Sequence, residues 1–119
     1  MSRFIKSFVF AFRGISASFS RENNCRIQLV LGVLAVMAGA WLGLERMEWV
    51  ALVLCIALVI GMEMINSAIE KTCDRITRER DDYVRYIKDA AAGAVLWTSL
   101  GAAAVGAIIF VPKIIHLLV

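Results

Sequence analysis

Three long stretches that are almost free of charge constrain this chain more than any other feature. The first and third, residues 27–44 and 90–111, contain no charged residue, and the middle one, residues 49–69, contains only Glu63. A helix needs about 20 apolar residues to cross a bilayer core. With 61% hydrophobic residues and a mean hydropathy of +0.76, the chain is predicted to be an all-α integral membrane protein. We predict a single domain, residues 1–119, with transmembrane helices at 27–44, 49–71 and 89–111.

The basic residues lie almost entirely in two of the segments that flank these helices. Of the thirteen lysines and arginines, five precede the first helix, six lie between the second and third, and two lie elsewhere, Arg46 and Lys113. Because Lys and Arg collect on the cytoplasmic side of membrane proteins, the N-terminus and the charged link are predicted in the cytoplasm and the C-terminus outside. The net charge is only +3, and we expect the lipid bilayer, not nucleic acid, as the partner of these residues.

Residues 1–24 have the pattern of an amphipathic surface helix. At 100° per residue, five large apolar side chains fall within an arc of about 80°, with Lys6 and Arg13 on the opposite side. Arg13 also interrupts the apolar core that a signal peptide would require. A helix of this kind lies in the membrane surface with its apolar face down. That face consists of Phe4, Phe8, Phe12, Ile15 and Phe19.

Three polar residues interrupt the second predicted membrane helix. Glu63, Asn66 and Glu70 are spaced i, i+3 and i+7, which places them on one helix face. A charged side chain deep in a bilayer costs about 3 kcal/mol and usually has a function. Counting about 1.5 Å per residue from Trp49 puts Glu63 just inside the cytoplasmic boundary and Glu70 at it. A dry carboxylate suits proton abstraction and a wetter one suits Mg²⁺; the alternative is a structural polar face between helices.

Other residues that could carry chemistry are few. The three cysteines, Cys25, Cys55 and Cys73, form no CxxC pair and are predicted to be reduced thiols, and His116 is predicted to be an interfacial residue. The sequence contains no GxxxxGK[ST] phosphate loop and no protein-kinase signature. Carboxylates, Mg²⁺ and scattered basic residues would have to support any phosphoryl transfer. They suffice chemically, because this reaction depends mainly on positioning and charge neutralisation.

Four motifs, spread over essentially the whole chain, resemble those of the small bacterial membrane diacylglycerol kinase/undecaprenol kinase family. The most specific are Glu63-Met-Ile-Asn-Ser-Ala-Ile-Glu70, followed by Asp74, and Lys88-Asp-Ala-Ala-Ala-Gly-Ala-Val95. Arg21-Glu22-Asn23-Asn24 resembles the first block of the family, and Phe12-Arg13-Gly14 resembles its surface-helix motif. The ending Ala-Ala-Gly-Ala-Val95 is more similar to undecaprenol kinases than to diacylglycerol kinases.

The resemblance implies a homotrimer in the bacterial inner membrane, with sites shared between protomers. Its implied activity is phosphorylation of a membrane lipid alcohol, diacylglycerol or undecaprenol, with MgATP. Glu63 would be the general base, Asn66 would orient the reacting groups, and Glu22 and Glu70 would hold Mg²⁺. The lipid would contact Arg3 and Glu63. The nucleotide would contact Arg3, Phe10, Glu22, Glu70, Glu79, Lys88 and Asp89.

The chain departs from the family pattern at two places. Phe10 stands where some members have a tyrosine, so a hydroxyl contact is lost there, and Glu79 lies between Arg78 and Arg80 without the Glu-Tyr-His of many members. A small proton-coupled transporter with an embedded glutamate is the alternative function, although such transporters usually have four spans and the key acid in the first. A non-catalytic assembly factor would leave the shared face of Glu63 and Glu70 unexplained.

Overall fold

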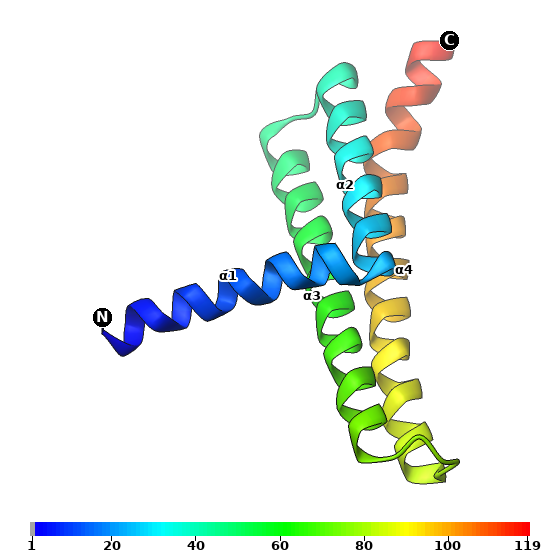
Figure 1. The fold of residues 1–119 in the computed structure, drawn as a ribbon. Helices are drawn as coiled ribbons and strands as arrows, with labels where there is room; N and C mark the ends of the chain where they lie inside the picture. The colour runs from blue at the N-terminus through cyan, green and yellow to red at the C-terminus, as the bar shows by residue number, and fades with distance from the viewer. Residues whose placement is uncertain (1) are drawn as a thin grey trace.

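The computed structural model describes residues 2–119 and consists of four helices (Figure 1). An N-terminal helix, α1 (Arg3–Arg21), is followed by α2 (Asn23–Leu42), α3 (Arg46–Ile76) and α4 (Asp82–Leu118). The last three are each long and apolar enough to cross a membrane, and residues 2–119 contain no strand. The predicted fold class, three transmembrane helices with an N-terminal amphipathic helix, is therefore confirmed.

Helix α1 projects from the other helices at a wide angle (Figure 1). Ser2 caps it by accepting a hydrogen bond from the Ile5 N–H group at 3.3 Å, and none of its residues is buried. Its aromatic face is exposed, with the Phe4 and Phe8 rings packed edge to face at 5.1 Å between centroids. Glu22, in an extended conformation, separates α1 from α2 and lets the chain change direction. An exposed apolar face outside the bundle is suited to the membrane surface.

Helices α2 and α3 form a tight antiparallel hairpin. Gly43 ends α2 with a φ of 79°, a left-handed conformation that glycine adopts without steric cost. Glu45 then begins α3, and its N–H group donates to Glu48 Oε1 at 2.9 Å in a capping box. The two helices approach closely at buried Gly32, where an added Cβ would lie 2.9 Å from Ile56 Cγ2. The turn and this close contact fix α2 against α3.

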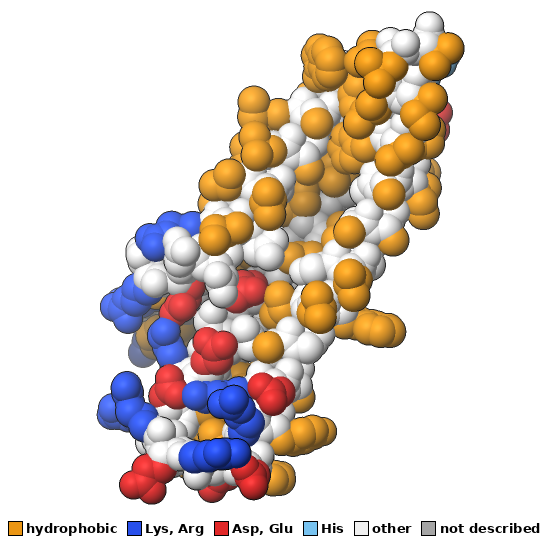
Figure 2. All heavy atoms as spheres, turned by 90° about the vertical axis from the view of Figure 1, so that its right-hand side faces the viewer, with side chains coloured by type: hydrophobic (Ala, Val, Ile, Leu, Met, Phe, Trp, Pro, Cys, Tyr) orange, Lys and Arg blue, Asp and Glu red, His pale blue; other side chains and the backbone are white. Residues whose placement is uncertain are grey.

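Helices α3 and α4 are longer than a membrane requires. Their 31 and 37 residues extend about 46 and 55 Å, against about 30 Å for a bilayer core. Helix α4 runs past both ends of the predicted span 89–111 and continues through Pro112. Both helices pass the level of α1 (Figure 1), and acidic and basic side chains gather at that end, below a mostly hydrophobic surface (Figure 2). We call residues 70–88 the charged end; at the opposite end Lys113 pairs with Glu48 at 3.0 Å.

Candidate functional site

The polar face of α3 contains a buried acid. Glu63 is 4% exposed, and Asn66 and Ser67 are each 7% exposed, whereas every other charged side chain of residues 2–119 is half-buried or exposed. Cys25, near the start of α2, is buried beside Glu63 and Ser67, so α2 limits the access of water to this face. Asn66 Oδ1 is buried and accepts no hydrogen bond within residues 2–119. Leaving a buried acceptor unpaired costs about 1–3 kcal/mol, and a ligand that donates a hydrogen bond to Asn66 Oδ1 would remove this cost. Asn66 therefore offers a binding group one turn from Glu63.

Glu22 reaches the same side of α3 from the junction between α1 and α2. Its extended backbone is held by two hydrogen bonds: its N–H group donates to Ser18 O at 2.9 Å, and its carbonyl accepts from the Arg26 N–H group at 3.3 Å. Its carboxylate forms an ion pair with Lys71. The pair brings Glu22 to the turn of α3 that also carries Glu70.

A second ion pair joins α3 to α4 at the charged end, beyond the predicted spans. Lys88 Nζ donates a hydrogen bond to Asp74 Oδ1 at 2.6 Å. This hydrogen bond lowers the pKa of Asp74 and raises the pKa of Lys88, so both groups are charged at neutral pH. The exposed carboxylate of Glu70 also acts on Lys88 and favours its charged form. Glu70, Asp74 and Lys88 therefore form one charged cluster next to the buried face.

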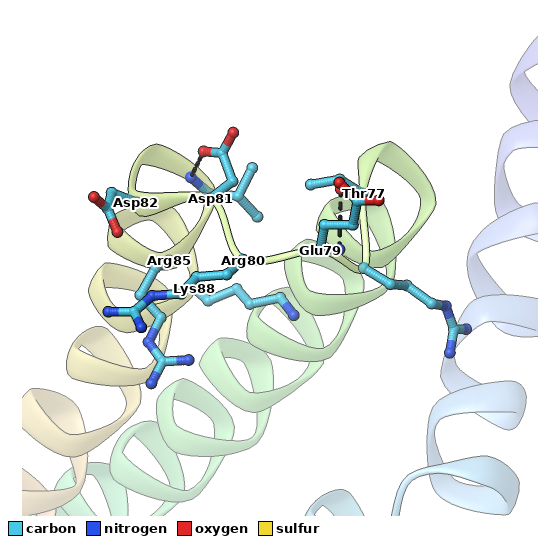
Figure 3. Close-up of a pocket in the computed structure, with 9 residues that line it drawn as sticks. Thr77, Glu79, Arg80, Asp81, Asp82, Arg85 and Lys88 are labelled. Atoms are coloured by element: carbon cyan, nitrogen blue, oxygen red, sulfur yellow. Dashed lines mark hydrogen bonds between the residues drawn. The ribbon is translucent and has the colours of Figure 1, made fainter.

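The connection between α3 and α4 encloses a cavity of about 510 Å³. The Thr77 hydroxyl accepts from the Glu79 N–H group at 3.1 Å, and Asp81 caps α4 by accepting from the N–H groups of Tyr83 and Val84. Figure 3 shows Arg80, Arg85 and Lys88 beside one another on the α4 side of the loop. The lining combines four cationic with three acidic side chains: Arg78, Arg80, Arg85 and Lys88, and Glu79, Asp81 and Asp82. The cavity thus brings two of the expected nucleotide residues, Glu79 and Lys88, together.

Some of the expected site residues are not brought together within one chain. Arg3 and Phe10 are exposed on α1, which points away from α3 and α4 (Figure 1), and the Phe10 ring lies 5.8 Å from the guanidinium of Arg13. Asp89 is exposed next to Lys88. Glu63, Asn66, Glu70, Glu22 and Lys88, in contrast, occupy successive levels from the buried face to the charged end.

Sequence reasoning missed the partners of two expected site residues. The sequence identifies Lys71 only as a basic residue of the second link and Asp74 only as part of a motif. Asp74 could have been found, because it follows Glu70 by four residues and shares its helix face. The Glu22–Lys71 pair joins residues 49 positions apart, and no local periodicity reports such a contact.

The implied Mg²⁺ can be compared with the oxygen atoms that the chain offers. Residues 2–119 hold no group of three or more His, Cys, Asp or Glu side chains placed to bind a metal ion. Mg²⁺ typically binds through one or two carboxylates together with water and substrate phosphates. Glu22 and Glu70 supply two carboxylates, and Asn66 supplies an unpaired amide oxygen. This donor set fits a Mg²⁺ ion whose remaining ligands are water molecules or nucleotide phosphates.

Comparison with known proteins identifies the family of the chain. Residues 9–110 match the family model of prokaryotic diacylglycerol kinase. The chain is 35% identical to the undecaprenol kinase of Bacillus subtilis (strain 168), over 96% of this chain and 93% of that protein. It is 33% identical to a diacylglycerol kinase of Synechocystis sp., over 95% of this chain and 65% of that protein. It is also 34% identical to a diacylglycerol kinase of Escherichia coli (strain K12), over 80% and 78%. The chain therefore belongs to the prokaryotic diacylglycerol kinase family and is a membrane lipid kinase.

Proposed function

We propose that this kinase transfers the γ-phosphoryl group of MgATP to the hydroxyl of a membrane lipid alcohol, diacylglycerol or undecaprenol, and releases the lipid monophosphate and ADP. The observation that carries the proposal is the buried carboxylate of Glu63, one turn from the unpaired Asn66 Oδ1. Lipid chains can approach this face from the bilayer, and a soluble nucleotide can approach it from the charged end. A lipid kinase needs such a junction between a dry and a wet region.

The orientation of the chain follows from its charges. Eleven of the thirteen Lys and Arg residues lie on α1, at the start of α2 or in residues 71–88. The positive-inside rule places all of these on the cytoplasmic side, where ATP is available. The bacterial inner membrane, with the N-terminus inside and the C-terminus outside, is the proposed location.

Glu63 acts as the general base in this proposal. Its carboxylate takes the proton of the lipid hydroxyl as the lipid oxygen bonds to the γ-phosphorus and the bond from that phosphorus to the ADP oxygen breaks. Asn66 Oδ1 is an acceptor without a partner, and it can hold the hydroxyl or a water molecule in line for transfer.

Glu22 and Glu70 hold the metal in this proposal, and the charged cluster holds the nucleotide. A bound Mg²⁺ ion would neutralise phosphate charge during transfer. Lys88 is aligned by Asp74, which keeps its ammonium in the cluster. Glu79 lines the same cavity as Lys88, and Asp89 follows Lys88 in α4. Lys88 supplies positive charge to the phosphates, and Glu79 contacts the rest of the nucleotide.

Arg3 and Phe10 support a site shared between protomers. Both belong to α1, the helix that projects from its own bundle (Figure 1), and both are exposed. In a homotrimer, the α1 helix of one protomer places these residues against the lipid and nucleotide of a neighbour. Arg3 then contributes a cation and Phe10 an apolar ring to the composite site.

The test is purified protein in detergent with γ-labelled ATP and a panel of diacylglycerol, undecaprenol and a lipid lacking a hydroxyl. Labelled phospholipid or undecaprenyl phosphate that requires Mg²⁺ and is absent with the third lipid supports the proposal. If no lipid is labelled while the protein in vesicles moves protons with a solute, the chain is a transporter instead. The ratio of the two products under equal conditions identifies the preferred lipid.

A further inference from the structure

Among the described residues 2–119, the Glu22 carboxylate forms one ion pair, with Lys71, and a metal ion bound to this carboxylate would have to replace it. In the ion pair the Lys71 side chain is 65% exposed, whereas the Glu22 side chain is 22% exposed. The carboxylate stands on a fixed stem, because the Glu22 backbone is held on both sides by hydrogen bonds to Ser18 and Arg26. The ammonium, in contrast, stands on a flexible four-carbon chain in water. One partner of the pair is fixed and the other is free to move.

The pair is weak enough to exchange. Exposed ion pairs contribute about 0–1 kcal/mol, and a lysine ammonium is a single point charge without the two-pronged geometry of arginine. A divalent cation at the same carboxylate carries twice the charge. The displaced ammonium has another acid within range, since Lys71 already acts on Asp74 one turn further along α3. After the exchange, the Lys71 ammonium would therefore stay next to the charged cluster, close to Asp74.

We propose that Lys71 is a positioning residue for the metal ligand Glu22: its ammonium occupies the carboxylate in the nucleotide-free chain, and the divalent cation displaces it. The inference rests on the proposed role of Glu22 in metal binding. Lys71 keeps the carboxylate oriented and neutralised until the metal arrives, and it competes with the metal for that carboxylate.

The test is Mn²⁺ binding to the nucleotide-free protein in detergent, followed by electron paramagnetic resonance, because Mn²⁺ shares the preference of Mg²⁺ for oxygen ligands. Lys71→Met should bind Mn²⁺ up to about fivefold more tightly than the wild type, the factor that corresponds to an exposed pair of about 1 kcal/mol. Lys71→Arg should keep wild-type affinity or bind more weakly. Arg75→Met is the matched control, since Arg75 is exposed on the same helix one turn further and should change the affinity less than twofold.

A double-mutant cycle separates the inference from the function on which it rests. Glu22→Gln should lose most of the Mn²⁺ binding, and adding Lys71→Met to it should have no further effect. If Glu22→Gln loses Mn²⁺ binding but Lys71→Met does not bind Mn²⁺ more tightly, the role of Lys71 is overturned and Glu22 remains a metal ligand. If Glu22→Gln binds Mn²⁺ as tightly as the wild type, both the metal role of Glu22 and the positioning role of Lys71 are overturned. Equal tightening in Arg75→Met, or weaker binding in a Lys71→Met protein of normal melting temperature, also overturns the inference.

Discussion

The Lys88 ammonium lies 2.6 Å from the Asp74 carboxylate, so α3 and α4 are joined by charge at the charged end, as Glu48 and Lys113 join them at the other. The contact at the charged end is also part of the site, because it fixes the lysine that is expected to meet the nucleotide. Its effect on stability and its effect on nucleotide binding can be measured separately.

The Asp74–Lys88 pair predicts a defined pH dependence of stability. The pKa of Asp74 is lowered, so its contribution is present above the unfolded value and is lost as pH falls through the folded pKa. The pKa of Lys88 is raised, so its contribution is present below the unfolded value and is lost as pH rises through the folded pKa. Asp74→Asn should therefore lower the stability by a small and constant amount between about pH 5 and pH 9, as measured by unfolding in detergent. A difference in stability between wild type and variant that stays undiminished down to about pH 2 would contradict this assignment.

Glu63→Gln should lower kcat about 10²–10⁴-fold, the usual contribution of a general base, and should leave MgATP affinity nearly unchanged. Glu63→Asp should also be slow, because the shorter side chain withdraws the carboxylate from a hydroxyl whose depth the membrane fixes. Turnover with lipid and equilibrium nucleotide binding measure the two effects. Near-normal turnover in Glu63→Gln would exclude Glu63 from the chemistry, and loss of insertion would favour a purely structural role.

Glu70→Gln should raise the Mg²⁺ concentration needed for half-maximal activity, because one anionic oxygen is removed from a hard cation. The protein should still insert, since Glu70 is exposed in the folded chain. A titration of activity against Mg²⁺ at fixed ATP checks this. Activity equal to wild type at limiting Mg²⁺ would show that Glu70 is not a ligand.

Gly32→Ala should destabilise the hairpin of α2 and α3 by about 1–3 kcal/mol, the usual cost of overpacking. The new methyl group would lie 2.9 Å from Ile56 Cγ2, and a β-branched side chain in a helix has little freedom to move away. Gly61→Ala is the control, because no heavy atom lies within 4 Å of its added Cβ. Ile56→Ala should relieve the clash, so the double variant should lose less stability than the sum of the single variants. Additive losses would mean that the two residues do not meet.

The two ends of the chain should lie on opposite sides of the membrane. The basis is the division of eleven to two in the basic residues. In a variant with Cys25, Cys55 and Cys73 replaced, single cysteines at positions 2 and 119 should react with an impermeant maleimide from opposite sides of oriented vesicles. Labelling of both from one side would contradict the three-span topology.

The fold could be predicted because the lipid bilayer accepts only long apolar segments, and the charged residues of this chain lie almost entirely outside three such segments. An apolar segment of about 20 residues can cross a bilayer only as a helix or as part of a closed barrel. On a helix, the i, i+3, i+7 spacing of Glu63, Asn66 and Glu70 places the three residues on one face. The full length of α3 and α4 was harder to predict, because residues 70–76 and 82–88 are polar and hydrophobicity gives no signal for them. Their helix continues through pairing of side chains between neighbouring helices, as in Asp74 and Lys88.

The features of the site that could not be predicted from the sequence depend on contacts between segments that lie far apart in the chain. The pairing of Glu22 with Lys71 depends on the angle at which the chain turns at Glu22, and that angle has no counterpart in periodicity. The same holds for Arg3 and Phe10, which were expected at the site from motif position and lie on the exposed part of α1. Their placement depends on a second copy of the chain, which one sequence cannot describe.

The three-residue turn at 43–45 has a consequence for the direction from which a substrate can arrive. That end of the molecule presents a short turn, the end of α4, and the Glu48–Lys113 pair, whose charges already satisfy each other. The other charged side chains near this turn, Glu45 and Arg46, are exposed, and the buried face of Glu63 and Asn66 lies further along α3, toward the charged end. In the proposed orientation, a lipid alcohol in the outer leaflet would first have to cross to the inner leaflet before this chain could phosphorylate it.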